Sequence, residues 1–193
     1  MINETIKIEK KEKMDFPPIP KDVYPVELLD ITLHERPTYK TKALPAEQQI
    51  MEKVFKFQFT ILEGKDGETD LRGRNLWASF VPTYLYEGKN GKNELYQIAE
   101  AFLSRTLTPE DEATLDNEVL NSWISKQIRI TNDHKTSKQG GVFDIITGYL
   151  KAGKPLPSLT AEEKEKAKVK PKDDKDTNQK SNDEQIKIDD IPF

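Results

Sequence analysis

The chain has 193 residues, its formal net charge is −4, and charged residues make up 33% of it. This length suffices for one domain with additional segments, and the overall acidity lacks the basic signature of most nucleic-acid binders. The absence of cysteine excludes disulfide bonds and thiolate metal sites. No apolar run approaches the about 20 residues of a membrane span, and the charged start does not resemble a signal peptide, so we expect a soluble cytoplasmic protein.

The first half of the chain predicts three strands. Residues 1–20 are charged and then proline-rich, and we expect a flexible arm there. Apolar alternation predicts a strand over 23–34 with a bulge near Leu29 and Asp30, followed by a long polar connection over 36–52. The clearest strand covers 54–62. Phe55, Phe57 and Phe59 lie on one face of this strand and polar residues lie on the other, so these three rings are expected in the core.

The third predicted strand covers 71–81, after a turn at 63–67. In it, Leu76, Ala78 and Phe80 share one face and Trp77 lies on the other. If the first face is the core, Trp77 lies outside with a ligand, and the alternative is that Trp77 itself is a core residue.

The second half predicts helices and two more strands. Apolar spacing favours a helix over 94–105 capped by Asn93, and Thr108 with Pro109 is typical of the start of a second short helix. Further strands are expected over 126–131 and 142–149, with a polar loop over 132–141 between them.

This order of elements is that of an OB-fold, a five-stranded Greek-key barrel. We therefore predict a mostly β barrel over residues 21–152, with a helix between the third and fourth strands. A small β-sandwich or a mixed α+β domain is the alternative. An OB-fold binds oligonucleotides through its second and third strands and its first–second and fourth–fifth loops, and these two loops are the long ones here.

The segment after residue 152 differs in composition. Residues 160–187 are nearly empty of apolar side chains, which predicts a disordered linker over 153–182 and an acidic tip over 183–193. The last residues are Asp189, Asp190, Ile191, Pro192 and Phe193. This ending resembles the tip of bacterial and phage single-stranded DNA-binding proteins, in which an OB domain precedes a disordered linker.

The resemblance implies a docking site for replication, recombination and repair proteins of the helicase, primase and exonuclease type. Pro192 limits the entropy lost on docking, and Phe193 offers an apolar anchor. Asp189 and Asp190 would steer the tip toward the basic rim of a partner's pocket. The chain departs from the family pattern because Ile188 precedes only two Asp residues. It resembles a divergent phage-type member acting in a bacterial or infected cell, and whether it forms a homo-oligomer stays open.

Single-stranded DNA is bound by cations along its backbone and by flat side chains on which bases stack. Tyr39 is followed by Lys40 and Lys42 in the first long loop. Tyr84 and Tyr86, after the third strand, are close to Lys89 and Lys92. For each of these aromatic residues, half-buried packing is the alternative. The candidate DNA-binding residues are Tyr39, Lys40, Lys42, Lys56, Arg72, Arg74, Trp77, Tyr84, Tyr86, Lys89, Arg129, Lys135 and Lys138.

The sequence gives little indication of catalysis. It has two histidines, no phosphate-binding glycine loop and no metal-ligand spacing. We therefore predict a protein that is not an enzyme, uses no metal or cofactor, coats and protects single-stranded DNA without strong sequence preference, and recruits partners through its tip. The alternatives are an interaction module that redirects partners of a cellular single-strand-binding protein without binding DNA, and a divergent nuclease.

Overall fold

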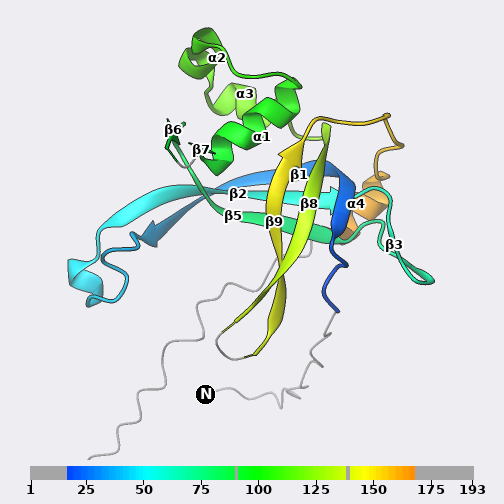
Figure 1. Ribbon diagram of the computed structural model, residues 1–193, viewed down its shortest axis with the longest axis horizontal. Helices are drawn as coiled ribbons and strands as arrows, with labels where there is room; N and C mark the ends of the chain where they lie inside the picture. The colour runs from blue at the N-terminus through cyan, green and yellow to red at the C-terminus, as the bar shows by residue number, and fades with distance from the viewer. Residues whose placement is uncertain (1–16, 90, 138–139, 168–193) are drawn as a thin grey trace, which may run out of the picture.

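Five long strands form one antiparallel sheet that curls around the core (Figure 1). The computed structural model describes residues 17–89, 91–137 and 140–167. The strand order in the sheet is β5-β2-β1-β8-β9, and the end strands β5 and β9 lie near each other. The bounds are β1 Asp22–Pro37, β2 Met51–Ile61, β5 Asn75–Pro82, β8 Gln127–Thr136 and β9 Val142–Leu150.

The remaining elements are short hairpins and helices. The hairpins are β3 (Lys65–Asp66) with β4 (Thr69–Asp70), and β6 (Glu87–Gly88) with β7 (Gly91–Lys92). The helices are η1 (Ala46–Gln48), α1 (Glu94–Leu103), α2 (Pro109–Thr114), α3 (Asn117–Asn121) and α4 (Ala161–Ala167). The predicted mostly β fold, with a helix between the third and fourth long strands, is confirmed. No helix within the described ranges has the length and apolar character required to cross a bilayer.

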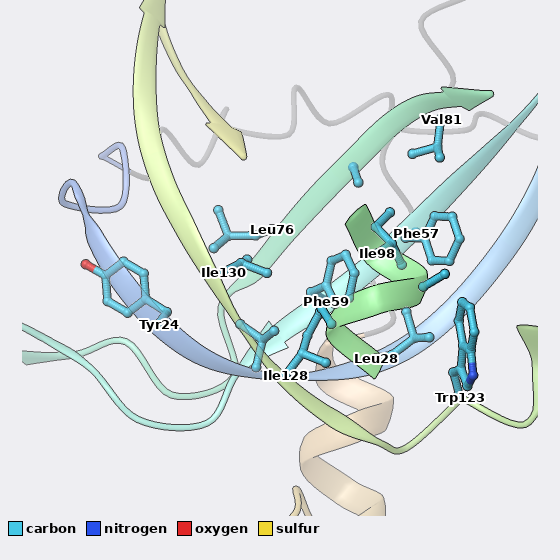
Figure 2. Packing of buried hydrophobic residues seen from close by; sticks show 14 of the residues in the cluster. Tyr24, Leu28, Phe57, Phe59, Leu76, Val81, Ile98, Trp123, Ile128 and Ile130 are labelled. Atoms are coloured by element: carbon cyan, nitrogen blue, oxygen red, sulfur yellow. The ribbon is translucent and has the colours of Figure 1, made fainter. Parts of the chain in front are cut away.

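The core lies between the inner face of the sheet and α1 (Figure 2). Phe57 and Phe59 of β2 are fully buried, as predicted, and Phe55 is partly buried against the same cluster. Helix α1 contributes Ile98, and Trp123 stacks on Phe102 with ring centroids 4.9 Å apart. Alternation in the strands and 3.6-residue spacing in α1 therefore place the apolar side chains on one common core.

Local side-chain bonds define where the helices begin, as the sequence indicated. The Asn93 side chain accepts from the Tyr96 amide at the start of α1. Thr108 and Asp111 form a reciprocal capping box at the start of α2, with Pro109 at its first position. These bonds satisfy amides that have no partner within the helix.

Strands β1 and β2 extend beyond the rest of the sheet as an arm, defined here as residues 30–56, in which β5 still pairs with β2 at 54–56 (Figure 1). The predicted bulge is present, because the β1–β2 register shifts between Leu28 and Asp30. The connection expected over 36–52 is shorter, since paired residues reach Pro37 and Met51. Likewise β8 continues to Thr136, so much of the loop expected over 132–141 is paired hairpin instead.

The structure differs from the predicted linker at residues 157–167, which pack on the outer face of the sheet. Leu159 and Ala167 are buried there. The fully buried Glu27 of β1 has the Lys164 ammonium as its ion-pair partner, and Gln58 and Asn75 both donate to the Ala167 carbonyl. This polar segment is ordered by specific polar contacts, which composition does not reveal.

The folded domain also begins earlier than the predicted boundary at residue 21. Ile19 is buried in the core. Its amide donates to Asp144, 3.0 Å away, and its carbonyl accepts from the Asn132 amide group at 2.7 Å. His134 Nε2 lies 2.7 Å from the same carbonyl and must donate, because a carbonyl can only accept. Residues 17–20 are therefore part of the fold rather than of a flexible arm.

Candidate nucleic-acid interface

A groove of about 590 Å³ lies where the end strands β5 and β9 approach each other. Three of its lining side chains are aromatic: Trp77 and Phe80 of β5 and Phe143 of β9. Phe80 and Phe143 are exposed, and Trp77 is half-buried. Glu94 of α1 also lines the groove. The groove therefore combines flat apolar faces with access from solvent.

Phe80 points out of the fold because β5 contains a bulge. Phe55 pairs with Val81 and Lys56 pairs with Ser79, which leaves Phe80 as an extra residue. Its φ is 72°, in the left-handed region, and its side chain is 56% exposed. The prediction that Phe80 shares the core face with Ala78 is therefore wrong, because the bulge changes the alternation and Val81 takes the core position.

The backbone at Phe80 stores strain. A bulky residue at positive φ costs on the order of 1–3 kcal/mol, and such residues cluster at functional sites. Exposing a large aromatic side chain adds a second unfavourable contribution. The two together mark Phe80 as a candidate ligand contact rather than a packing residue.

Cations lie against two of the aromatic rings. Lys56 Nζ is 4.4 Å from the ring centroid of Trp77. Arg36 Cζ is 4.7 Å from the ring centroid of Phe80, and its Nε donates to Glu52 over 2.8 Å. Each of these two rings thus has a cation next to it, which can contact a phosphate when a base stacks on the ring. Single-strand grooves combine aromatic rings and cations in this way.

The other predicted aromatic residues lie outside the groove lining. Tyr39 is exposed near the tip of the arm, with Lys42 Nζ 4.4 Å from its ring centroid and Lys40 exposed beside it. Tyr84 and Tyr86 are exposed in the loop after β5. Asn93 fixes this loop through the carbonyls of both tyrosines, at 2.6 Å and 2.8 Å.

Three of the predicted arginines make internal contacts. Arg72 donates to the Leu62 carbonyl at 2.8 Å and pairs with Glu163 at 3.2 Å, so it fixes the segment before α4. Arg74 donates to the Pro17 carbonyl at 2.6 Å. Arg129 donates to the Lys151 carbonyl at 3.2 Å. None of the three lines the groove.

The predicted lysines differ in position. Lys135 is exposed and is the direct cross-strand partner of the groove residue Phe143. Lys89 is exposed between β6 and β7 and does not line the groove. Lys138 and residues 189–193 lie outside the described residues.

The structure thus brings together two predicted residues, Lys56 and Trp77, and adds three that the sequence did not suggest: Arg36, Phe80 and Phe143. Arg36 fell in an expected loop, and the bulge at Phe80 has no sequence signal. Phe143 lay in a predicted strand, and its neighbour Lys135 was the available hint. No cluster of histidine and acidic side chains in the described ranges is arranged to hold a metal ion.

Glu94, at the edge of the groove, provides a pH-dependent prediction. The Tyr149 hydroxyl donates to it over 2.5 Å. Burial raises the pKa of Glu94, and the hydrogen bond from Tyr149 partly offsets this rise. An acid whose pKa is raised in the folded state stabilises the fold below its unfolded pKa, and this stabilisation is lost as pH rises through the folded pKa.

Glu94→Gln should therefore gain stability relative to the wild type as pH rises above about 4.5 toward the raised folded pKa of Glu94, with a slope of at most about 1.4 kcal/mol per pH unit. Chemical denaturation of both proteins across this range checks the difference. An unchanged difference at every pH would contradict the effect of burial on Glu94.

No family model, curated protein or solved structure matches this chain.

Proposed function

We propose that this chain is an OB-fold protein that binds single-stranded DNA in the groove between β5 and β9. The sheet order β5-β2-β1-β8-β9 and the proximity of β9 to β5 support a five-stranded Greek-key barrel. Helix α1 lies between the third and fourth long strands in the chain. The β1–β2 arm and the β8–β9 hairpin correspond to the loops that flank an OB ligand face.

The observation that carries the proposal is the set of rings in one groove, two of them with cations against them. Trp77 with Lys56, Phe80 with Arg36, and Phe143 offer stacking surfaces next to positive charge. Stacking contributes about 1–3 kcal/mol per base and tolerates any base. The proposed binding is therefore sequence-tolerant, and the protein coats and protects unpaired strands without catalysis.

The acidic segment at residues 189–193 completes the proposal. Its likeness to the tips of single-stranded DNA-binding proteins supports a role in recruiting replication, recombination and repair proteins. The segment that leads to this tip leaves the fold beside β5, because the carbonyl of the last described residue, Ala167, accepts a hydrogen bond from the Asn75 side chain at the beginning of β5. Deleting Phe193 should remove partner docking and leave oligonucleotide affinity unchanged or slightly higher.

Fluorescence anisotropy of a labelled oligo(dT) with the full chain tests DNA binding. If Arg36, Lys56 and Lys135 each contact one phosphate, the logarithm of the affinity should fall with the logarithm of salt concentration with a slope of about −2. A duplex of the same length should bind more weakly, because its bases are not available for stacking. No binding to oligo(dT) at low salt would contradict the proposal.

A second candidate is a protein-binding module that uses the tip to redirect partners of another single-strand-binding protein. The net charge of −4 favours it, because phosphate is repelled by overall acidity. Tip-dependent partner binding without oligonucleotide affinity would select this function.

A further inference from the structure

The arm leaves one backbone edge of β1 unpaired. Strand β8 pairs with β1 only from Asp22 to Glu27, and the last bonds on that side are those of Leu28 with Ser125 and Lys126. Over residues 30–36, β1 pairs with β2 alone. On the other edge of this stretch, the described residues provide one backbone hydrogen bond, from the Ile31 amide to the Asp30 carboxylate over 2.9 Å. The stretch extends roughly 23 Å at about 3.3 Å per residue.

An open edge of this length is unusual in a folded protein. Edge strands are normally short, covered or protected by inward charges, because their free amides and carbonyls pair readily with another strand. Beyond His34 the arm has only the two strands β1 and β2, and a two-stranded ribbon is only marginally stable in water. At the centre of this edge, Leu33 is 55% exposed. The arm therefore has both the backbone groups and the apolar side chain that a further strand would use.

The sequence of this edge is complementary to itself. In an antiparallel pair of two copies with a two-fold axis at Leu33, Leu33 faces its own equivalent. The same register places Asp30, whose carboxylate also accepts from the Ile31 amide, opposite Arg36 of the second copy, twice. It also places Thr32 opposite His34 and Ile31 opposite Glu35. Opposite charges and apolar residues facing each other both favour such a pair, and Pro37, which has no amide to donate, falls beyond the paired segment.

We propose that two copies of this chain associate through the β1 edge of the arm, residues 30–36, to form a two-fold symmetric dimer with a continuous sheet. A symmetric contact of this kind closes on itself and stops at two copies. The contact is small, so it belongs to the weak class of interfaces. Arg36 also lies against Phe80 in the groove, but the tests change Leu33 and Val23, which do not line the groove, so this proposal and the DNA-binding proposal can fail separately.

A single cysteine at the axis tests this register, because the chain has no cysteine of its own. Directly opposed residues of an antiparallel pair lie within the Cα separation that a disulfide spans. Under mild oxidation, Leu33→Cys should form a disulfide-linked dimer, and a reductant should convert it back to single chains. The matched control is Val23→Cys, at an exposed position of the same strand outside the proposed contact, which should cross-link at least tenfold more slowly.

Sedimentation of the unmodified chain, in a concentration series up to about 1 mM, gives the second measurement. The mean mass should rise from 22.2 kDa toward twice that value. Leu33→Lys should return it to one chain without changing the circular dichroism spectrum. A mass of one chain throughout the series, or equal cross-linking at both cysteine positions, would overturn the proposal.

Discussion

Replacing Trp77 and Phe80 together with alanine is expected to lower the affinity for a single-stranded oligonucleotide by about 30-fold to 20,000-fold, since each lost stack costs about 1–3 kcal/mol. Both side chains line the groove and both have a cation against the ring. Fluorescence anisotropy at fixed salt measures the loss.

The matched control removes two aromatic rings that lie elsewhere. Tyr84→Ala with Tyr86→Ala deletes two exposed rings from the loop after β5, outside the groove lining. We expect this variant to lose much less affinity than the groove variant. An equal loss of affinity in both variants, or a larger loss in the control, would show that the binding site lies outside the groove.

Removing the Lys164 ammonium is expected to produce the largest loss of stability. Glu27 is 0% exposed, and the Lys164 ammonium is its ion-pair partner. Removing one member of a buried pair leaves an uncompensated charge and costs about 3–5 kcal/mol, a large part of the about 5–15 kcal/mol that stabilises a typical domain. Urea denaturation of Lys164→Met should show this as a lower midpoint.

Two further variants separate the buried pair from general effects of lysine removal. Lys166→Met removes a lysine of the same helix from an exposed pair with Glu162 and should change stability by less than about 0.5 kcal/mol. Glu27→Leu combined with Lys164→Met removes both charges and should recover most of the loss. A wild-type midpoint for Lys164→Met alone would show that α4 does not hold the outer face of the sheet.

The sequence predicted the elements whose periodicity reflects burial. The Phe57 and Phe59 row, the Asn93 cap and the bulge after Leu28 follow from local rules of alternation, capping and strand irregularity. It did not predict the extent of the arm, because most residues over 32–52 face solvent and lose the apolar pattern. Helix α4 was missed because its order comes from distant partners such as Glu27 and Gln58.

The candidate site was predictable only in part. Alternation along β2 and β5 placed Lys56 and Trp77 on the outer face, where the structure has them in contact. A bulge reverses alternation after the point where it occurs, and its position at Phe80 depends on pairing with β2. Isolated cations such as Arg72 suggested DNA contacts. In the structure these side chains bind carbonyl and carboxylate groups of residues that are distant in the sequence, which the sequence alone does not reveal.

The most direct test of the groove is the fluorescence of Trp77 on addition of oligo(dT). The chain has two tryptophans, and Trp123 is buried in the core. A base stacked on Trp77 should quench its emission in the wild type, and the salt titration that releases the strand should restore it. Trp77→Phe should bind with little quenching. Binding that leaves the emission unchanged, or equal quenching in Trp77→Phe, would show that the strand lies elsewhere and contradict the proposed site.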